Sequence, residues 1–143
     1  STNGTLSCGT DATGAGGSVN HGTTTITFIA DIDGAGWLCT NCPAAGTEFN
    51  PGVVVDLNGT NKIRVGANCD VACTSTTIVV EILDASNNIL ATVNPNVLDT
   101  PMLGNFTNES ITGTSTLNVR IKGTGNAADD YRVTHVYAEI SPQ

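Results

Sequence analysis

The chain has 143 residues, of which 13% are charged and 4% aromatic, and its formal net charge at pH 7 is −8. This negative charge excludes a basic nucleic-acid-binding domain, because phosphate contacts need clustered Lys or Arg. No apolar run reaches the ~20 residues of a membrane span. Thr, Val, Ile, Gly and Asn prevail over the strong helix formers, which favours a small all-β domain over a helical bundle.

The amino-terminal part is rich in Gly, Ser and Thr and holds few side chains that could be buried. We therefore expect residues 1–22 to form an arm or extended segment and residues 23–143 to form one domain. The chain begins at Ser1 without a basic or apolar leader. This is typical of a mature secreted protein whose signal peptide has been removed, so we expect an extracellular or cell-surface location.

Stretches in which apolar residues alternate with Thr or charged residues follow the arm and predict β-strands. In chain order, strands are expected at residues 23–30, 37–39, 52–57, 61–67, 76–83, 89–93, 115–122 and 131–140. The strand at 52–57 is predicted to be buried and to end at the turn dipeptide Asn58-Gly59, and residues 84–88 are the plainest hairpin turn. This spacing predicts an all-β fold, a two-sheet antiparallel β-sandwich of the jelly-roll type.

The basic side chains all fall on predicted strands, opposite apolar positions where the alternation is clear. They are Lys62, Arg64, Arg120, Lys122 and Arg132. We expect them to line a polar sheet face and to pair across strands with Glu81 or Glu139. The alternative is a small cationic patch that meets an acidic neighbour.

Four of the five cysteines form two close pairs, Cys39 with Cys42 and Cys69 with Cys73. They could form two disulfides, within each pair or across the pairs, or supply four thiolate ligands to zinc. We favour disulfides, because the chain has the composition of a secreted protein and lacks the basic and glycine residues that surround zinc knuckles. The connectivity cannot be deduced from the sequence.

The remaining cysteine, Cys8, lies in the Gly-rich arm. A thiol on a mobile arm is well placed to bond a neighbouring chain, so Cys8 is a candidate for an inter-chain disulfide. The alternative is that Cys8 pairs with Cys39 or Cys42 and that another cysteine is left free and buried.

Three segments carry a resemblance to a known class of domain: the hairpin at residues 78–90, the strand at 117–125 and the segment 129–140. From about Asn61 onward they resemble the jelly-roll β-sandwiches of carbohydrate-binding modules and related cell-surface domains. In such domains an acidic residue just before the last strand often helps to hold a structural calcium, which implies Asp129 or Asp130 as a ligand. Sugar-binding modules also present exposed aromatic side chains. Trp37 is the candidate for ligand stacking, with a core position as the alternative for a lone Trp, whereas the three Phe residues are expected to be buried.

A second acidic site stands at Asp31 and Asp33, which precede Gly34 as carboxylates do in many calcium-binding loops. The alternate spacing can aim both carboxylates at one cation. Cys42 occupies the twelfth position, where an EF-hand loop has Glu, so this is not an EF-hand, and an ordinary turn is the alternative. The candidate calcium ligands are therefore Asp31, Asp33, Asp129 and Asp130.

Asn-X-Ser/Thr sequons make several asparagines candidates for N-glycosylation. They are Asn3, Asn58, Asn105 and Asn108. We find no nucleophile motif and no metal-binding helix motif, and the histidines are limited to His21 and His135. We therefore expect no enzymatic activity.

Two functions remain. The scarcity of aromatics, the Gly-rich arm with its odd cysteine and the Thr- and Val-rich strands favour a non-enzymatic extracellular structural protein. Such a protein would assemble with copies of itself into a surface filament, pilus-like appendage or coat, because an open sheet edge can accept a neighbour's strand. The alternative is a calcium-dependent carbohydrate-binding or adhesion module whose partner is a polysaccharide.

Overall fold

The computed structural model describes residues 22–29, 36–71, 78–107, 111–124 and 130–143. These residues contain strands and no helix, and every strand pair is antiparallel, as predicted. The strands are β1 (Thr24–Thr27), β2 (Trp37–Cys39), β3 (Thr47–Val71), β4 (Val79–Leu83), β5 (Ile89–Val93), β6 (Met102–Leu103), β7 (Ile111–Lys122) and β8 (Tyr131–Pro142).

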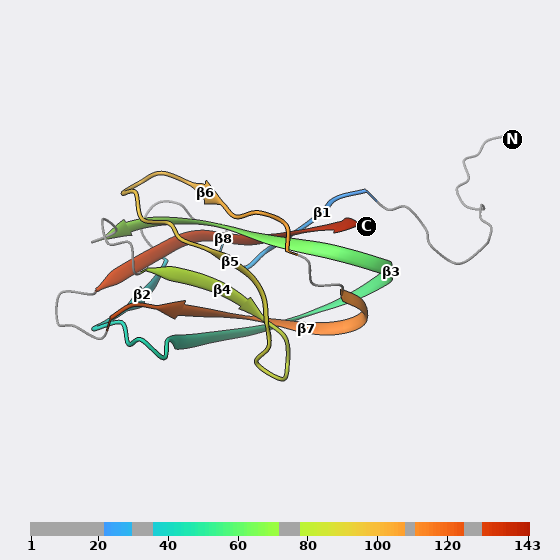
Figure 1. Cartoon of the computed structure of the whole chain (residues 1–143). Helices are drawn as coiled ribbons and strands as arrows, with labels where there is room; N and C mark the ends of the chain where they lie inside the picture. Colours follow the sequence, from blue (N-terminus) through green and yellow to red (C-terminus); the bar gives the residue numbers. More distant parts are fainter. Residues whose placement is uncertain (1–21, 30–35, 72–77, 108–110, 125–129) are drawn as a thin grey trace, which may run out of the picture.

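The 25-residue strand β3 determines the architecture (Figure 1). Residues 47–61 pair with β7, and residues 61–71 pair with β8. The register with β7 breaks between Leu57 and Asn61, where Gly59 has a φ of 66°. The sequence predicts two strands separated by a turn at Asn58-Gly59. The structure instead has one continuous strand that bends there, because both halves find pairing partners.

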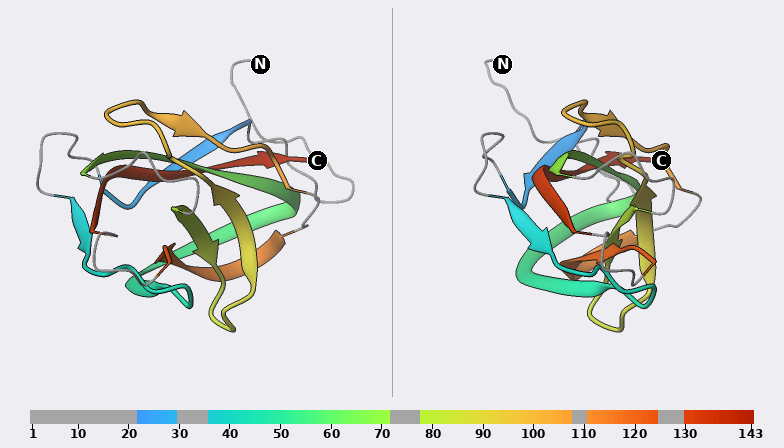
Figure 2. Two further views of the ribbon diagram at one scale, coloured as in Figure 1. Left: turned by 60° about the vertical axis from the view of Figure 1, so that its left-hand side comes forward. Right: turned by 90° about the vertical axis from the view of Figure 1, so that its left-hand side faces the viewer.

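The bend in β3 folds the sheet into two layers (Figure 2). The strand order is β1-β8-β3-β7-β4-β5, with β2 also paired to β8 and β6 to β3. One layer therefore holds β1, β2, β8, β6 and the second part of β3, and the other holds the first part of β3 with β7, β4 and β5. This arrangement is consistent with the predicted sandwich; the jelly-roll connectivity stays a prediction.

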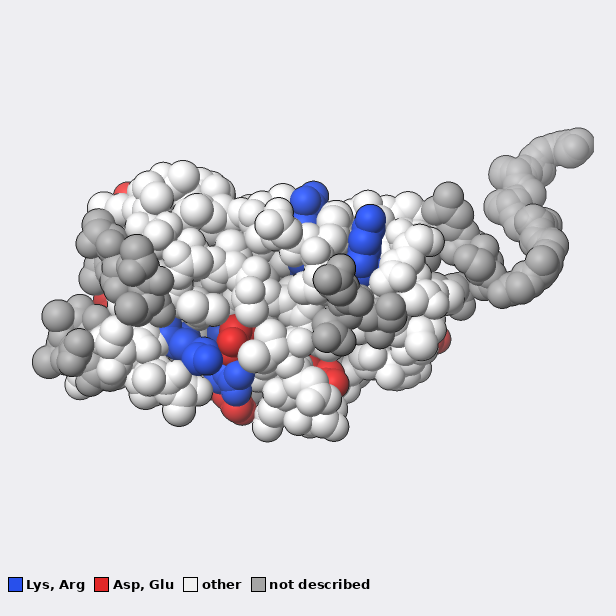
Figure 3. Space-filling model, in the orientation of Figure 1, with Lys and Arg blue, Asp and Glu red and all other residues white. Residues whose placement is uncertain are grey.

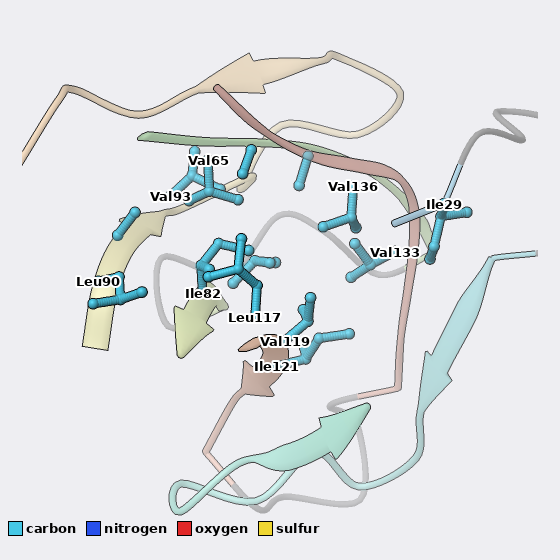
Figure 4. Close-up of a cluster of buried hydrophobic side chains, with 14 of the residues drawn as sticks. Ile29, Val65, Ile82, Leu90, Val93, Leu117, Val119, Ile121, Val133 and Val136 are labelled. Carbon is cyan, nitrogen blue, oxygen red and sulfur yellow. The ribbon is translucent and has the colours of Figure 1, made fainter. Parts of the chain in front are cut away.

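The hydrophobic core lies between the layers (Figure 4). Ile63 and Val65 of β3 and Leu117, Val119 and Ile121 of β7 are 0% exposed. Each such side chain contributes about 1.5–3 kcal/mol by leaving water. The strict alternation of these residues with polar ones is the pattern that a half-buried strand requires, so the predicted inward faces of both strands are confirmed.

On one side of the two-layer structure the segment after β6 makes backbone contacts. Gly104 N–H donates to the carbonyl of Val65 at 2.9 Å, and Thr107 N–H donates to that of Ile63 at 3.1 Å. The segment after β6 thus extends the layer of β3 and β8. On its far side it meets β5, since a Cβ on Gly104 would lie 2.4 Å from the carbonyl oxygen of Thr92.

A β-bulge shapes β8 near its middle. The register with β3 shifts between Gly66 and Asn68, so that His135 and Val136 together oppose Ala67. His135 takes up the extra residue with a φ of 46°, in the left-handed region that His enters more readily than most residues. The bulge exposes the carbonyl of Val136, which accepts hydrogen bonds from the N–H groups of Phe28 and Ile29 at 2.7 and 3.0 Å. It thereby anchors the chain after β1.

Candidate interaction site

The side opposite the β6–β5 contact carries a groove between the two layers. It is lined by Thr24 and Ile26 of β1, residues 54–57 of β3 and Ile140 of β8, and its volume is about 350 Å³. We call it the β1–β3 groove. It lies where the last strand of one layer faces the last strand of the other.

Both walls of the groove are strand edges. Within the part of the chain that the structure describes, β1 pairs only with β8, and residues 53–57 pair only with β7. The second edge of each strand therefore points its backbone N–H and C=O groups away from the existing sheet. Such an edge is a template for one more strand.

The groove's side chains are mainly apolar. Val54 is 63% exposed, the largest value among the exposed large hydrophobic residues of the described chain, whereas Val55 and Leu57 beside it are 7% and 9% exposed. Ile26 is half-buried and packs on the core. Among the described lining residues Asp56 is the one with a charge, and its Oδ1 accepts a hydrogen bond from the Thr114 hydroxyl at 3.4 Å.

The exposure of Val54 corrects the prediction that residues 52–57 form a buried strand. Three consecutive valines suggest burial on both faces. Val54 and Asp56 alternate with the buried Val55 and Leu57, so they lie on the face of β3 that points away from the core and stay in contact with water. The local signal that the prediction missed is Asp56, because residues two apart share a face of a strand and Asp56 marks the face of Val54 as the outer one.

The first predicted cysteine pair is a disulfide within the pair. Cys39 and Cys42 are bonded, with a Cα–Cα distance of 5.0 Å, and both are buried. A bonded pair has no thiolate to offer zinc, so these residues do not form half of a zinc site. Cys69 is disulfide-bonded as well. Cys8 and Cys73 lie outside the described residues.

Of the candidate calcium ligands, only Asp130 is described; Asp31, Asp33 and Asp129 lie outside the described residues. Asp130 Oδ1 accepts a hydrogen bond of 2.7 Å from the Asn41 N–H. Asn41 has a φ of 48°, so the carboxylate holds the turn that contains the disulfide. Among the described residues, no group of three or more His, Cys, Asp and Glu side chains could hold a metal ion.

The candidate stacking residue Trp37 packs against another ring. Its indole lies parallel to the Phe49 ring at 4.9 Å between centroids, with an interplanar angle of 5°. One face of the indole is therefore covered. Phe28, Phe49 and Phe106 are half-buried rather than buried as predicted. Phe106 lies beneath Lys62 and Arg64, whose charged groups are 4.9 and 4.4 Å from the ring centroid.

The predicted cross-strand ion pairs are present on the outer faces. Arg64 is 2.7 Å from Glu139, and Glu81 is 2.7 Å from Arg120 and 3.7 Å from Lys122. Each arginine lies directly opposite its glutamate in the register. Figure 3 shows acidic side chains beside the lower group of basic ones, so that group is not a bare cationic patch.

Arg132 has a partner that sequence reasoning missed. Its guanidinium donates two hydrogen bonds of 2.8 Å to the Asp70 carboxylate, and this bonding raises the pKa of Arg132 above its ordinary value. Asp70 precedes Val71, which pairs with Arg132, so the two side chains come from neighbouring strands near the register shift after Cys69. This pair fixes the end of β3 against the start of β8.

The remaining predicted site residues are the sequons. Asn105 is exposed beside β6 and so meets the steric requirement for glycosylation. The side chain of Asn58, at the bend in β3, is not described. Asn3 and Asn108 lie outside the described residues.

Comparisons with known proteins place the chain in no family. No protein-family model matches the chain, and no curated protein matches it. One solved structure is similar, that of the infectious bursal disease virus Gt strain, with 13% identity and a TM-score of 0.34. The match covers 86% of this chain and 32% of the viral chain. At this level of similarity it assigns neither a family nor an activity. Among the described residues no helix is long and apolar enough to span a membrane.

Proposed function

We propose that this chain is a non-enzymatic extracellular structural protein, a subunit that assembles with copies of itself into a surface filament, pilus-like appendage or coat. The observation that carries the proposal is the β1–β3 groove, in which two strand edges face one another across apolar side chains.

Monomeric proteins blunt such edges with Lys, Pro, bulges or a covering loop. In β1 the exposed side chains are threonines, and residues 53–57 of β3 present Val54 with a single acid, Asp56. Neither segment has a Lys or a Pro within it, and the Pro51 and register shift that precede residue 53 lie outside the five residues of the groove wall. An added strand would satisfy backbone groups on either wall and would remove Val54 from water. Assembly is the function that this surface serves.

An extracellular location is part of the proposal. The Cys39–Cys42 bond supports it, because disulfides persist in oxidising compartments and are rare in reducing ones. The paucity of Lys and the Thr-rich edge strand are typical of secreted β proteins.

The test is the state of association of the full chain. Negative-stain microscopy and size-exclusion chromatography across a range of concentrations, alongside a non-reducing gel, should show filaments or oligomers whose size grows with concentration. Chain that stays monomeric at every concentration, with or without reductant, would contradict the proposal.

The alternative function, a calcium-dependent carbohydrate-binding or adhesion module, has less support. One ring face of its stacking residue, Trp37, is already covered by Phe49. This alternative expects calcium to raise the melting temperature and a polysaccharide to quench indole fluorescence. A rise in melting temperature with calcium, or quenching by a polysaccharide, would support this alternative function.

A further inference from the structure

Within the described residues the β1–β3 groove is open, and its described lining residues belong to β1, β3 and β8. Its walls are four and five residues long, at β1 and at residues 53–57, which is the length of a short strand. Its occupant must therefore be an extended segment with at least one aliphatic side chain to place beside Val54 and Ile26. It must also carry no acid that would face Asp56.

We propose that this occupant is the segment around Leu6 of a second copy of the chain. The inference rests on the proposed function and makes it specific, since it names which surface accepts and which segment is donated. The inference depends on the match between an apolar groove, whose two strand edges have no further strand partner among the described residues, and an uncharged segment that precedes β1.

The sequence before β1 supports this choice. Residues 1–10 contain no charged side chain, so none of them repels Asp56. Leu6 and Val19 are the branched aliphatic residues of the first 21. Val19 is only five residues before Thr24, the first residue of β1, so the chain between them is too short to extend far.

Leu6 is followed by fifteen residues before Gly22, and fifteen residues can span up to about 50 Å when extended. Thr5 and Ser7 flank Leu6, so an extended segment would present the leucine on one face and small polar groups on the other.

The geometry also sets the form of the assembly. The donated segment and the accepting groove are different surfaces of the same chain, so the contact is heterologous. Each copy that accepts at its groove still has its own segment to donate. Such contacts produce an open filament unless the rotation between copies closes a ring.

Two variants of the full chain separate donation from acceptance. Leu6→Asp leaves the groove intact and removes the donated side chain. Val54→Asp leaves the segment intact and places a second acid beside Asp56. Val54 is 63% exposed, so this change should leave the fold intact, which circular dichroism and Trp37 fluorescence can verify. Should Val54→Asp misfold, Val54→Ser removes the same apolar contact without adding a charge.

The matched control is Ile89→Asp, because Ile89 is 43% exposed on β5, which pairs only with β4 among the described strands.

We expect each of Leu6→Asp and Val54→Asp to lose assembly by at least about tenfold in the concentration required, the equivalent of 1.4 kcal/mol. Ile89→Asp should assemble as the unmodified chain does. An equal mixture of Leu6→Asp and Val54→Asp should give one-to-one heterodimers and no longer species, because one variant can only accept and the other can only donate.

Other outcomes overturn the inference in distinguishable ways. If both groove and segment variants assemble normally while Ile89→Asp does not, the surface is the β5 edge, and the proposed function stands without this inference. If the mixture gives no heterodimer, the segment does not enter a second copy's groove. If the unmodified chain is monomeric throughout, the proposed function itself fails.

Discussion

At the scale of single residues, the most constrained charge is the carboxylate of Glu81. Its side chain is 4% exposed, and it is held by Arg120 at 2.7 Å and Lys122 at 3.7 Å. A buried carboxylate is tolerated only with cationic partners, and the loss of Arg120 leaves Glu81 with the longer contact to Lys122 at 3.7 Å. This pairing could be predicted from the sequence, since Glu81 and the basic residues occupy outward positions of neighbouring strands.

Arg120→Met should therefore destabilise the protein by about 3 kcal/mol, measured as a fall in the free energy of unfolding in urea. The matched control is the double variant Arg120→Met/Glu81→Leu, which removes both charges. It should recover stability to within about 1 kcal/mol of the unmodified chain. A single-variant cost below about 1 kcal/mol would mean that Glu81 behaves as an exposed ion-pair partner.

The ionisation of Asp84 predicts that the stability of the fold depends on pH. The side-chain hydrogen bond from Asn88 lowers the pKa of Asp84 below its ordinary value of 3.8, and the N–H groups of Asn88 and Ser86 act in the same direction. A lowered pKa in the folded state means that the charged form stabilises the fold. This contribution is present above the ordinary pKa and is lost as the pH falls through the folded one.

Asp84→Asn keeps an acceptor in the hairpin turn but removes the titration. We expect the melting temperature of the unmodified chain to exceed that of Asp84→Asn at pH 7, and the difference to shrink below pH 4. Thermal unfolding of both proteins from pH 7 to pH 2 provides the measurement. A difference that is constant over this range would show that the charge of Asp84 has no part in the turn.

At the scale of elements, the alternation of apolar and polar residues predicts where the strands lie, and β5 matches its predicted range. It does not predict that β3 continues through Asn58-Gly59. A turn dipeptide allows both a reversal and a bend, and distant pairing with β7 and β8 decides between them. For the same reason β7 begins at Ile111 and β6 pairs with β3, although residues 94–114 carry mainly turn signals.

Gly104→Ala tests the close approach of the segment after β6 to β5. A Cβ there would lie 2.4 Å from the carbonyl oxygen of Thr92, and backbone atoms cannot move aside as a flexible side chain can. The segment after β6 would have to separate from β5, at a cost of about 1–3 kcal/mol. Chemical denaturation should detect this, with the exposed neighbour Asn105→Ala as a control that stays within about 0.5 kcal/mol. Equal effects of the two substitutions would contradict the close approach.

At the scale of the whole molecule, Gly104 approaches β5 on one side, beside a hollow of about 560 Å³ between β5 and the β6 segment, and the other side holds the β1–β3 groove. The sequence suggests assembly through an open sheet edge but does not locate it. That location depends on the bend in β3, which makes residues 53–57 the end of a layer. Val54 lies with Asp56 on the outer face of this strand and is the most exposed large apolar side chain of the described residues.

Amide hydrogen exchange of the full chain, compared between its assembled and dispersed forms, tests the central claim most directly. The account predicts that amides of β1 and of residues 53–57 exchange at least about tenfold more slowly after assembly, because they gain hydrogen-bond partners. Amides of β5 should keep their rates and serve as an internal reference. Slower exchange at β5 with unchanged rates along the β1–β3 groove would contradict the account.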